Sequence, residues 1–141
     1  MLRLTKIFYF ETAHAIHNYQ GKCKNIHGHS YRLEVTVATD ASGDDYIPAP
    51  GFVIDFKDLK KIVQSTIVDQ FDHKLILSKD YLQANTGVEK QDSLVIWDVE
   101  PTAENILIYI KKHVDKELPE NTNLVCLKLY ETESSYAEWV K

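Results

Sequence analysis

The sequence predicts an α+β fold, in which a four-stranded, mostly antiparallel sheet carries two helices on one face in the order ββααββ. Three observations support this prediction. Apolar residues alternate with polar ones near both ends of the chain, two segments with helical apolar spacing lie between, and the 141 residues contain no internal repeat. A chain of this length forms about one domain, so we expect residues 1–141 to be a single domain.

The two N-terminal strands are predicted by composition and by alternation. Residues Leu4 to Glu11 are rich in Ile, Phe and Tyr, and a loop follows through Gly21. The second strand has the clearest alternation, and its apolar positions are Tyr31, Leu33, Val35 and Val37. The segment "DASGDDYIPAPG" (40–51) then ends the strand pattern, because its Gly and Pro residues favour turns.

Two helices are predicted by apolar spacing and by their end residues. Asp55 can cap the first helix, and Thr102 lies near the start of the second, which Pro119 ends. The apolar stripe of the first helix consists of Phe56, Leu59, Val63 and Ile67. The stripe of the second consists of Ala103, Leu107, Ile110, Val114 and Leu118. Between them, Ser78 to Glu100 has no regular period, and we interpret it as a loop that carries the short strand "SLVIWDVE".

Two further strands are expected at Leu124 to Glu131 and at Tyr136 to Val140. Helices on one face leave the other face of the sheet without a cover, and a small open sheet also leaves edge strands. Proteins commonly protect such edges by pairing across subunits or by closing a barrel. We therefore expect a homo-oligomer.

Composition and charge exclude several classes of protein. An apolar share of 44% and a charged share of 26% are typical of globular proteins, and the absence of an 18-residue apolar run argues against a membrane protein. The N-terminal residues do not resemble a signal peptide, so we expect the protein in the cytoplasm, with its two cysteines as free thiols. The net charge of −5 argues against a nucleic-acid partner.

Histidines gather in the segment "CKNIHGHS" (23–30). If the alternation of the second strand extends backward, His27 and His29 point to the same face as Tyr31. His14 lies near the end of the first strand and supplies a third imidazole if the two strands are neighbours. Three neutral imidazoles suit a tetrahedral zinc ion and leave one position open for substrate. The pattern thus predicts a candidate catalytic zinc site.

Other interpretations of these histidines stay open. A His-x-His pair in a strand more often serves packing or lies on the surface. Cys23 as a fourth ligand would instead give a closed structural zinc site. His17 could also replace His14 as a ligand if that segment coils. Spacing alone does not choose among these arrangements.

Cys23 is also a candidate catalytic thiol, since Lys22, Lys24 and a zinc ion would each favour its thiolate. Asp72 and His73, in "FDHK", form an adjacent carboxylate and imidazole that can relay protons, or they simply cap the loop after the first helix.

Glu131 shares its strand face with Val125, Leu127 and Leu129, and a charge on such an apolar face needs a partner. Two partners are possible. One is a bound heterocycle whose N–H groups donate two parallel hydrogen bonds to the carboxylate, and the other is Arg32.

Six fragments resemble a known family, in its order and approximate spacing: "FETAH", "CKNIHGHSY", "GFVIDFKDLK", "FDHK", "PTAEN" and "YET". Through these fragments the chain is similar to the 6-pyruvoyl-tetrahydropterin synthase and 6-carboxy-tetrahydropterin synthase family. The resemblance extends from about Phe8 to Glu131. The resemblance implies a tunnelling fold, in which three subunits close a barrel of antiparallel strands and two trimers stack into a hexamer.

Carried over by position, the resemblance also implies roles for individual residues. The zinc ligands would be His14, His27 and His29. Cys23 would be the catalytic thiol, and Asp72 with His73 would complete a proton relay, which in this family typically comes from a neighbouring subunit. Glu131 would anchor the pterin ring, with Thr102 and Glu104 close to the same pocket. For Glu104 the alternative is favourable electrostatics in the first turn of a helix.

The three-residue gap "KNI" before "HGH", together with "VIDF", resembles the bacterial 6-carboxy branch of this family, which feeds queuosine and other deazapurines. The resemblance then implies conversion of 7,8-dihydroneopterin triphosphate into 6-carboxy-5,6,7,8-tetrahydropterin, acetaldehyde and triphosphate. Three alternatives remain: the 6-pyruvoyl branch, which eliminates triphosphate without carbon–carbon cleavage, a pterin-binding protein without turnover, and a structural zinc protein.

Overall fold

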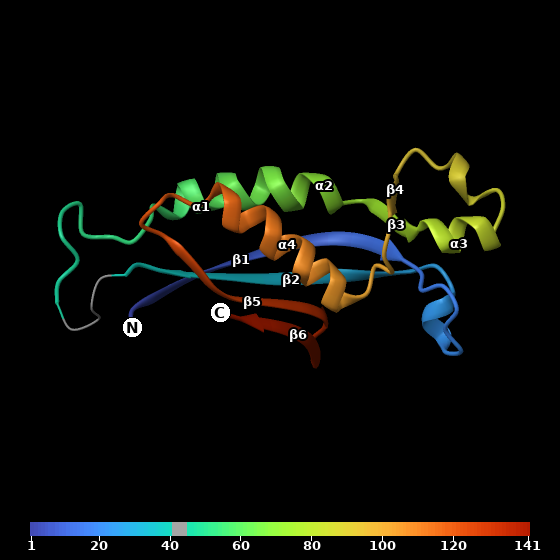
Figure 1. The fold of residues 1–141 in the computed structure, drawn as a ribbon, viewed down its shortest axis with the longest axis horizontal. Coiled ribbons are helices and arrows are strands. Elements are labelled where there is room, and N and C mark those ends of the chain that lie inside the picture. Colours follow the sequence, from blue (N-terminus) through green and yellow to red (C-terminus); the bar gives the residue numbers. More distant parts are fainter. Residues whose placement is uncertain (41–44) are drawn as a thin grey trace.

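The protein is described here from a computed structural model that covers residues 1–40 and 45–141. Within these residues, six strands form one curled sheet in the order β4-β3-β1-β2-β5-β6 (Figure 1). The strands are β1 (Arg3–His14), β2 (His27–Ala38), β3 (Lys74–Ser78), β4 (Leu94–Trp97), β5 (Asn123–Thr132) and β6 (Ser135–Val140). The pairs β1–β2, β2–β5 and β5–β6 are antiparallel, whereas β1–β3 and β3–β4 are parallel.

Two long helical segments cover one face of the sheet, as predicted (Figure 1). The first is continuous and consists of α1 (Phe56–Val63), a π-helical stretch η2 (Gln64–Val68) and α2 (Asp69–Phe71). The second is α4 (Ala103–Glu117). Shorter helical pieces are η1 (Lys22–Lys24), α3 (Lys79–Ala84) and η3 (Val88–Lys90).

The helix ends form as the sequence predicts. The Asp55 side chain accepts a hydrogen bond from the backbone N–H of Lys57, and the Thr102 side chain accepts one from that of Asn105. Most of the expected stripe positions are fully buried in the core: Leu59, Val63, Ile67, Leu107, Ile110 and Val114. Phe56 differs, because it lies in the first turn and 49% of it is exposed.

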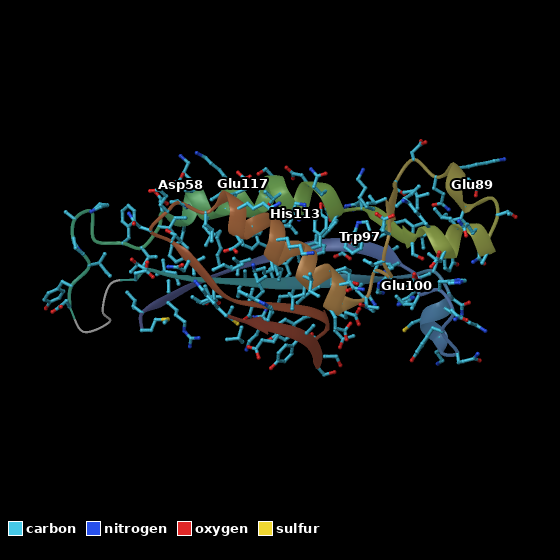
Figure 2. The ribbon with its side chains drawn as sticks, in the orientation of Figure 1. Asp58, Glu89, Trp97, Glu100, His113 and Glu117 are labelled. Carbon is cyan, nitrogen blue, oxygen red and sulfur yellow. The ribbon has the colours of Figure 1, made fainter. Side chains whose placement is uncertain are left out.

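The sheet is larger than predicted, and it is mixed. The segment 78–100 does contain a short strand, but β4 pairs with β3, which was missed, and both run parallel to β1. Such short strands have too few positions to show a period. Packing against α4 decides where they form. Trp97 on β4 stacks on Tyr109 of α4, with ring centroids 5.1 Å apart, and Tyr109 also stacks on His113, with centroids 3.8 Å apart. Trp97 and His113 are labelled in Figure 2.

One strand departs from simple alternation. The pairing of β5 with β2 shifts between Thr36 and Val37, so Leu124 rather than Val125 joins Leu127 in the core. A bulge of this kind inserts one residue and reverses the faces beyond it. The predicted break at 40–51 lies partly outside the described residues, because positions 41–44 belong to it.

The two faces of the sheet differ in exposure. The face under the helices holds Phe10, Tyr31, Leu33 and other fully buried side chains. The opposite face carries large exposed side chains, among them Tyr9 and Tyr136. None of the helices within the described ranges is both long and apolar enough to cross a membrane.

Helix α4 offers a direct test of this packing. Ile110 is fully buried, whereas Ile108 on the same helix is 47% exposed. Ile110→Ala should lower the free energy of unfolding by about 2–5 kcal/mol, because it leaves a cavity in the core. Ile108→Ala, the matched control, should change it by less than about 1 kcal/mol. Chemical denaturation of both variants measures the difference, and equal losses would contradict the packing.

Candidate metal and substrate site

The three histidines meet because of the register between β1 and β2. His14 lies directly opposite His27, and Thr12 lies opposite His29. Residues opposite each other in an antiparallel pair place their side chains on the same face. The ring centroid of His14 is consequently 4.6 Å from that of His27 and 5.1 Å from that of His29. One nitrogen from each ring lies within 4.8 Å of the others.

Backbone carbonyls orient two of these rings. Nδ1 of His14 donates to the carbonyl of Pro101 at 2.6 Å, and Nδ1 of His27 donates to that of Asn25 at 2.7 Å. A carbonyl only accepts, so each Nδ1 carries the proton and each Nε2 of a neutral ring carries a lone pair. These two Nε2 atoms lie 3.1 Å apart. Two lone pairs at that distance repel each other unless a cation lies between them.

The donor set fits zinc by its chemistry. Burial lowers the pKa of His14, and the neighbouring imidazoles lower it further, so this ring stays neutral at physiological pH. Neutral imidazoles held by backbone acceptors are the common ligand arrangement of zinc sites. Among the described residues, the cluster that could hold a metal consists of His14, His27 and His29. Cys23 and His17, the alternative ligands, lie outside it.

Glu131 lies next to the histidines, on the same face of β5 as Leu127 and Leu129. The pairing of β5 with β6 shifts between Tyr130 and Thr132, which leaves Glu131 at the bulge. Its Oε1 lies 3.9 Å from Nε2 of both His14 and His29. The alternative partner proposed from the sequence is wrong, because Arg32 pairs with Glu34 at 2.6 Å and stacks over Tyr130.

A cavity of about 310 Å³ joins most of the predicted site residues, a size within the range of small-molecule sites. Its lining includes His14, Cys23, Thr102, Glu104 and Glu131. Cys23 is exposed on η1, and its carbonyl accepts from the backbone N–H of Ile16, which ties the loop to the end of β1. Thr102 and Glu104 come from the start of α4, where Thr102 also serves as the helix cap.

Sequence analysis missed one polar group of this site. Tyr31 was interpreted as a core position, and its ring is indeed fully buried. Its ring packs edge-on against His29, with centroids 5.4 Å apart. Burial and the nearby Glu131 carboxylate raise the pKa of Tyr31 well above its usual range. A tyrosine in an alternating apolar strand gives no sequence signal that separates packing from function.

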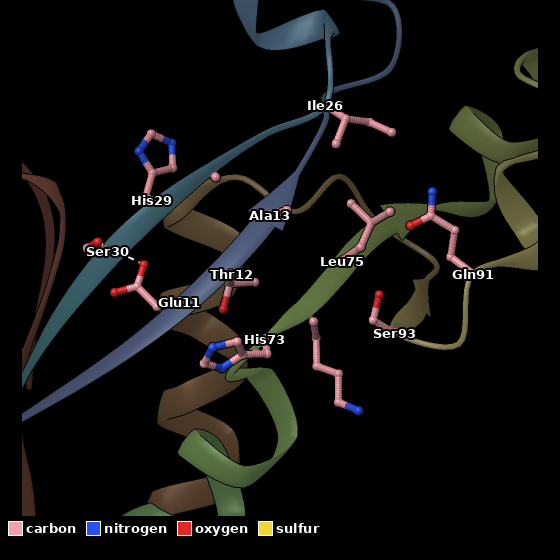
Figure 3. Close-up of a pocket in the computed structure, with 12 residues that line it drawn as sticks. Glu11, Thr12, Ala13, Ile26, His29, Ser30, His73, Leu75, Gln91 and Ser93 are labelled. Atoms are coloured by element: carbon pink, nitrogen blue, oxygen red, sulfur yellow. Dashed lines mark hydrogen bonds between the residues drawn. The ribbon is translucent and has the colours of Figure 1, made fainter.

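His73 lines a different hollow in the same chain, together with Glu11, His29 and Ser30 among other residues (Figure 3). Nδ1 of His73 lies 2.9 Å from Oδ2 of Asp72, and the ring is largely exposed. The backbone N–H of Glu11 donates to Asp72 and lowers its pKa, and His73 adds to that effect. The loop-cap interpretation thus describes the contacts of Asp72 within one chain.

A curled α+β sheet with helices on one face, three converging histidines and a carboxylate beside them defines a protein of the tunnelling-fold class with a candidate metal site. The family model described as 6-pyruvoyl tetrahydropterin synthase matches residues 3–141, and the chain belongs to this family of enzymes.

Relatives and solved structures agree with this placement. A protein from Rickettsia typhi named 6-carboxy-5,6,7,8-tetrahydropterin synthase is 35% identical over 142 residues, covering 98% of this chain and 99% of its own. A protein of the same name from Haemophilus influenzae is 34% identical over 145 residues, covering 99% of both. The 6-pyruvoyl tetrahydropterin synthase structure from Caenorhabditis elegans has a TM-score of 0.70 at 22% identity, covering 99% of this chain and 95% of that one, so it shares the fold.

The geometry predicts that removing one imidazole weakens metal binding. His27→Ala should lower zinc affinity by more than about 100-fold, since even the loss of an outer hydrogen-bond partner costs 10–100-fold. Competition against a chromophoric zinc chelator measures this affinity. His113→Ala is the matched control, because His113 lies on α4 and stacks on Tyr109. Equal zinc affinity in the two variants would contradict the assignment of the site.

Proposed function

We propose that this protein is a zinc-dependent lyase that converts 7,8-dihydroneopterin triphosphate into 6-carboxy-5,6,7,8-tetrahydropterin, acetaldehyde and triphosphate, a step toward queuosine and related deazapurines. The observation that carries the proposal is the pair of facing Nε2 atoms of His14 and His27, beside a cavity that also contains Cys23 and Glu131. The names of the relatives from Rickettsia typhi and Haemophilus influenzae support the 6-carboxy product. We expect the reaction in the cytoplasm, where an exposed thiol such as Cys23 stays reduced.

In this proposal His14, His27 and His29 hold the metal. A bound zinc ion would supply Lewis-acid chemistry, which makes a coordinated hydroxyl group easier to deprotonate. The carbonyls of Pro101 and Asn25 keep the first two rings in the required tautomer. The start of α4 therefore helps to position a ligand that lies on β1.

The other residues of the cavity would bind and deprotonate the substrate. Glu131 accepts two parallel hydrogen bonds from the N–H and amino groups of the pterin ring, which orients the side chain of the substrate. Cys23 as thiolate takes a proton from that side chain, and general acid–base help of this kind contributes about 10²–10⁴-fold. Thr102 and Glu104 border the same cavity and limit how the ring enters it.

Asp72 and His73 would contribute to the active site only in an oligomer. Within one chain His73 lines a different hollow from Cys23, and Asp72 is its ion-pair partner, so we assign both to the site of a neighbouring subunit. In the described sheet, β6 is an edge strand, and β1 pairs with β3 only through residues 12–14. These free edges support closure of a barrel by three copies, with a hexamer of two trimers as the expected assembly.

Incubation of the zinc-loaded protein with 7,8-dihydroneopterin triphosphate tests the function. We expect 6-carboxy-5,6,7,8-tetrahydropterin by mass spectrometry and a matching amount of acetaldehyde. A 6-pyruvoyl product without acetaldehyde would transfer the protein to the other branch, and an unchanged substrate would contradict both. Cys23→Ala should lower kcat by at least about 100-fold while zinc stays bound. Large loss of zinc in Cys23→Ser would favour a structural metal site instead.

Mixing two inactive variants tests whether the site is shared between subunits. Cys23→Ala and His73→Ala should each be inactive, because each removes one proton-transfer group. After dissociation and reassembly together, about a quarter of the shared sites should contain both intact groups and regain activity.

Refolding each variant alone is the control for the mixing experiment, and it should restore nothing. A mixture that also stays inactive, although it forms mixed oligomers by native mass spectrometry, would place His73 outside the site of its neighbour.

A further inference from the structure

The hydroxyl of Tyr31 is buried beside the candidate metal site, close enough to the Glu131 carboxylate for that group to raise its pKa, but no described residue meets the geometry of a hydrogen bond to it. Its ring is held on three sides, since it stacks on Phe10 with centroids 5.3 Å apart and meets His29 and His14 edge-on. A buried hydroxyl without a partner costs about 1–3 kcal/mol of stability. Packing alone does not explain it, because phenylalanine would fill the same space without that cost.

The sheet register brings this hydroxyl toward Glu131. The last paired residues of β2 and β5 at this end are Arg32 and Tyr130. Continuing the antiparallel register by one position sets Tyr31 opposite Glu131, on the face that also carries His29. Both side chains contact the same imidazoles: Glu131 lies 3.9 Å from Nε2 of His14 and of His29. The Glu131 side chain is still 29% exposed and has room to rotate.

Glu131 needs a donor that the histidines cannot provide. In the metal-loaded site their Nε2 atoms are lone-pair ligands, so they donate no proton to the carboxylate. The carboxylate could then turn toward the metal and fill the open position, or turn away from the pterin. A hydrogen-bond donor on the neighbouring strand β2 would hold the plane of the Glu131 carboxylate fixed.

We propose that Tyr31 is a positioning residue, whose buried hydroxyl donates a hydrogen bond to the Glu131 carboxylate when the pterin ring is bound. This bond holds the carboxylate in the plane of the pterin N–H donors and away from the open metal position. The inference rests on the proposed function, because Tyr31 is assigned a role through Glu131, the residue proposed to bind the pterin ring. It predicts that Tyr31 contributes to ligand affinity and not to the stability of the ligand-free protein.

Direct binding separates this role from turnover. Cys23→Ala blocks the reaction, so the Kd of 7,8-dihydroneopterin triphosphate can be measured in this background by pterin fluorescence. Adding Tyr31→Phe should raise the Kd about tenfold, the effect of one hydrogen bond to a charged group. Zinc content should stay the same. The melting temperature of the ligand-free protein should stay equal or rise, because the change removes an unpartnered buried hydroxyl.

Steady-state kinetics with Cys23 restored give a second measurement. Tyr31→Phe should raise KM about tenfold and change kcat by less than about twofold. Tyr109→Phe is the matched control: this tyrosine of α4 is also partly buried and stacked, but it lies against Trp97. It should leave both KM and zinc content unchanged.

A double-mutant cycle tests whether Tyr31 acts through Glu131. In a Glu131→Gln background, Tyr31→Phe should have little further effect on Kd. Additive effects of the two changes would overturn the proposal, as would an unchanged Kd in Tyr31→Phe alone. Loss of zinc together with a lower melting temperature would assign Tyr31 a structural role instead. If the Cys23→Ala parent itself fails to bind the pterin, the proposed function fails and this inference fails with it.

Discussion

The antiparallel register of β1 and β2 is the constraint on which the candidate site depends. Because His14 is opposite His27 and Thr12 is opposite His29, three imidazoles share one face of the sheet. A shift of one residue would turn the β1 side chains to the other face of the sheet, and His14 would no longer lie beside His27 and His29. The buried positions of β1 hold this register, since the same shift would turn Phe8 and Phe10 out of the core. Core packing and metal geometry are therefore fixed by the same pairing.

The helices contribute to the site through their ends. The segment that starts α4 supplies the Pro101 carbonyl to His14, and it places Thr102 and Glu104 at the cavity. The end of α2 is tied to β1 by the hydrogen bond from Thr12 to Phe71 and by that from the Glu11 N–H to Asp72. Strand β1 thus connects both groups of polar residues, although His73 and Cys23 line different hollows. In the proposed oligomer, one rigid strand would contribute to two neighbouring active sites.

The pairing of β5 with β2 determines where the Glu131 carboxylate lies. Regular alternation would have kept Val125, Leu127, Leu129 and Glu131 on one face. The first bulge moves Leu124 into the core in place of Val125, and the second leaves Glu131 at the point where β5 departs from β6. Glu131 keeps the face of Leu127 and Leu129, so its carboxylate faces the imidazoles and the buried Tyr31 phenol instead of Arg32.

The sequence by itself determined the local features: the alternation of β2, the shared face of His27 and His29, the helix caps at Asp55 and Thr102, and the buried stripes of both helices. Each of these follows from the period of a strand or helix, which depends only on neighbouring residues. Tertiary structure decided the rest, namely the parallel pairing of β3 and β4, the orientation of the imidazoles by distant carbonyls, and the place of Tyr31 beside Glu131. These features depend on contacts between residues such as His14 and Pro101, which lie far apart in the sequence, so no local period encodes them.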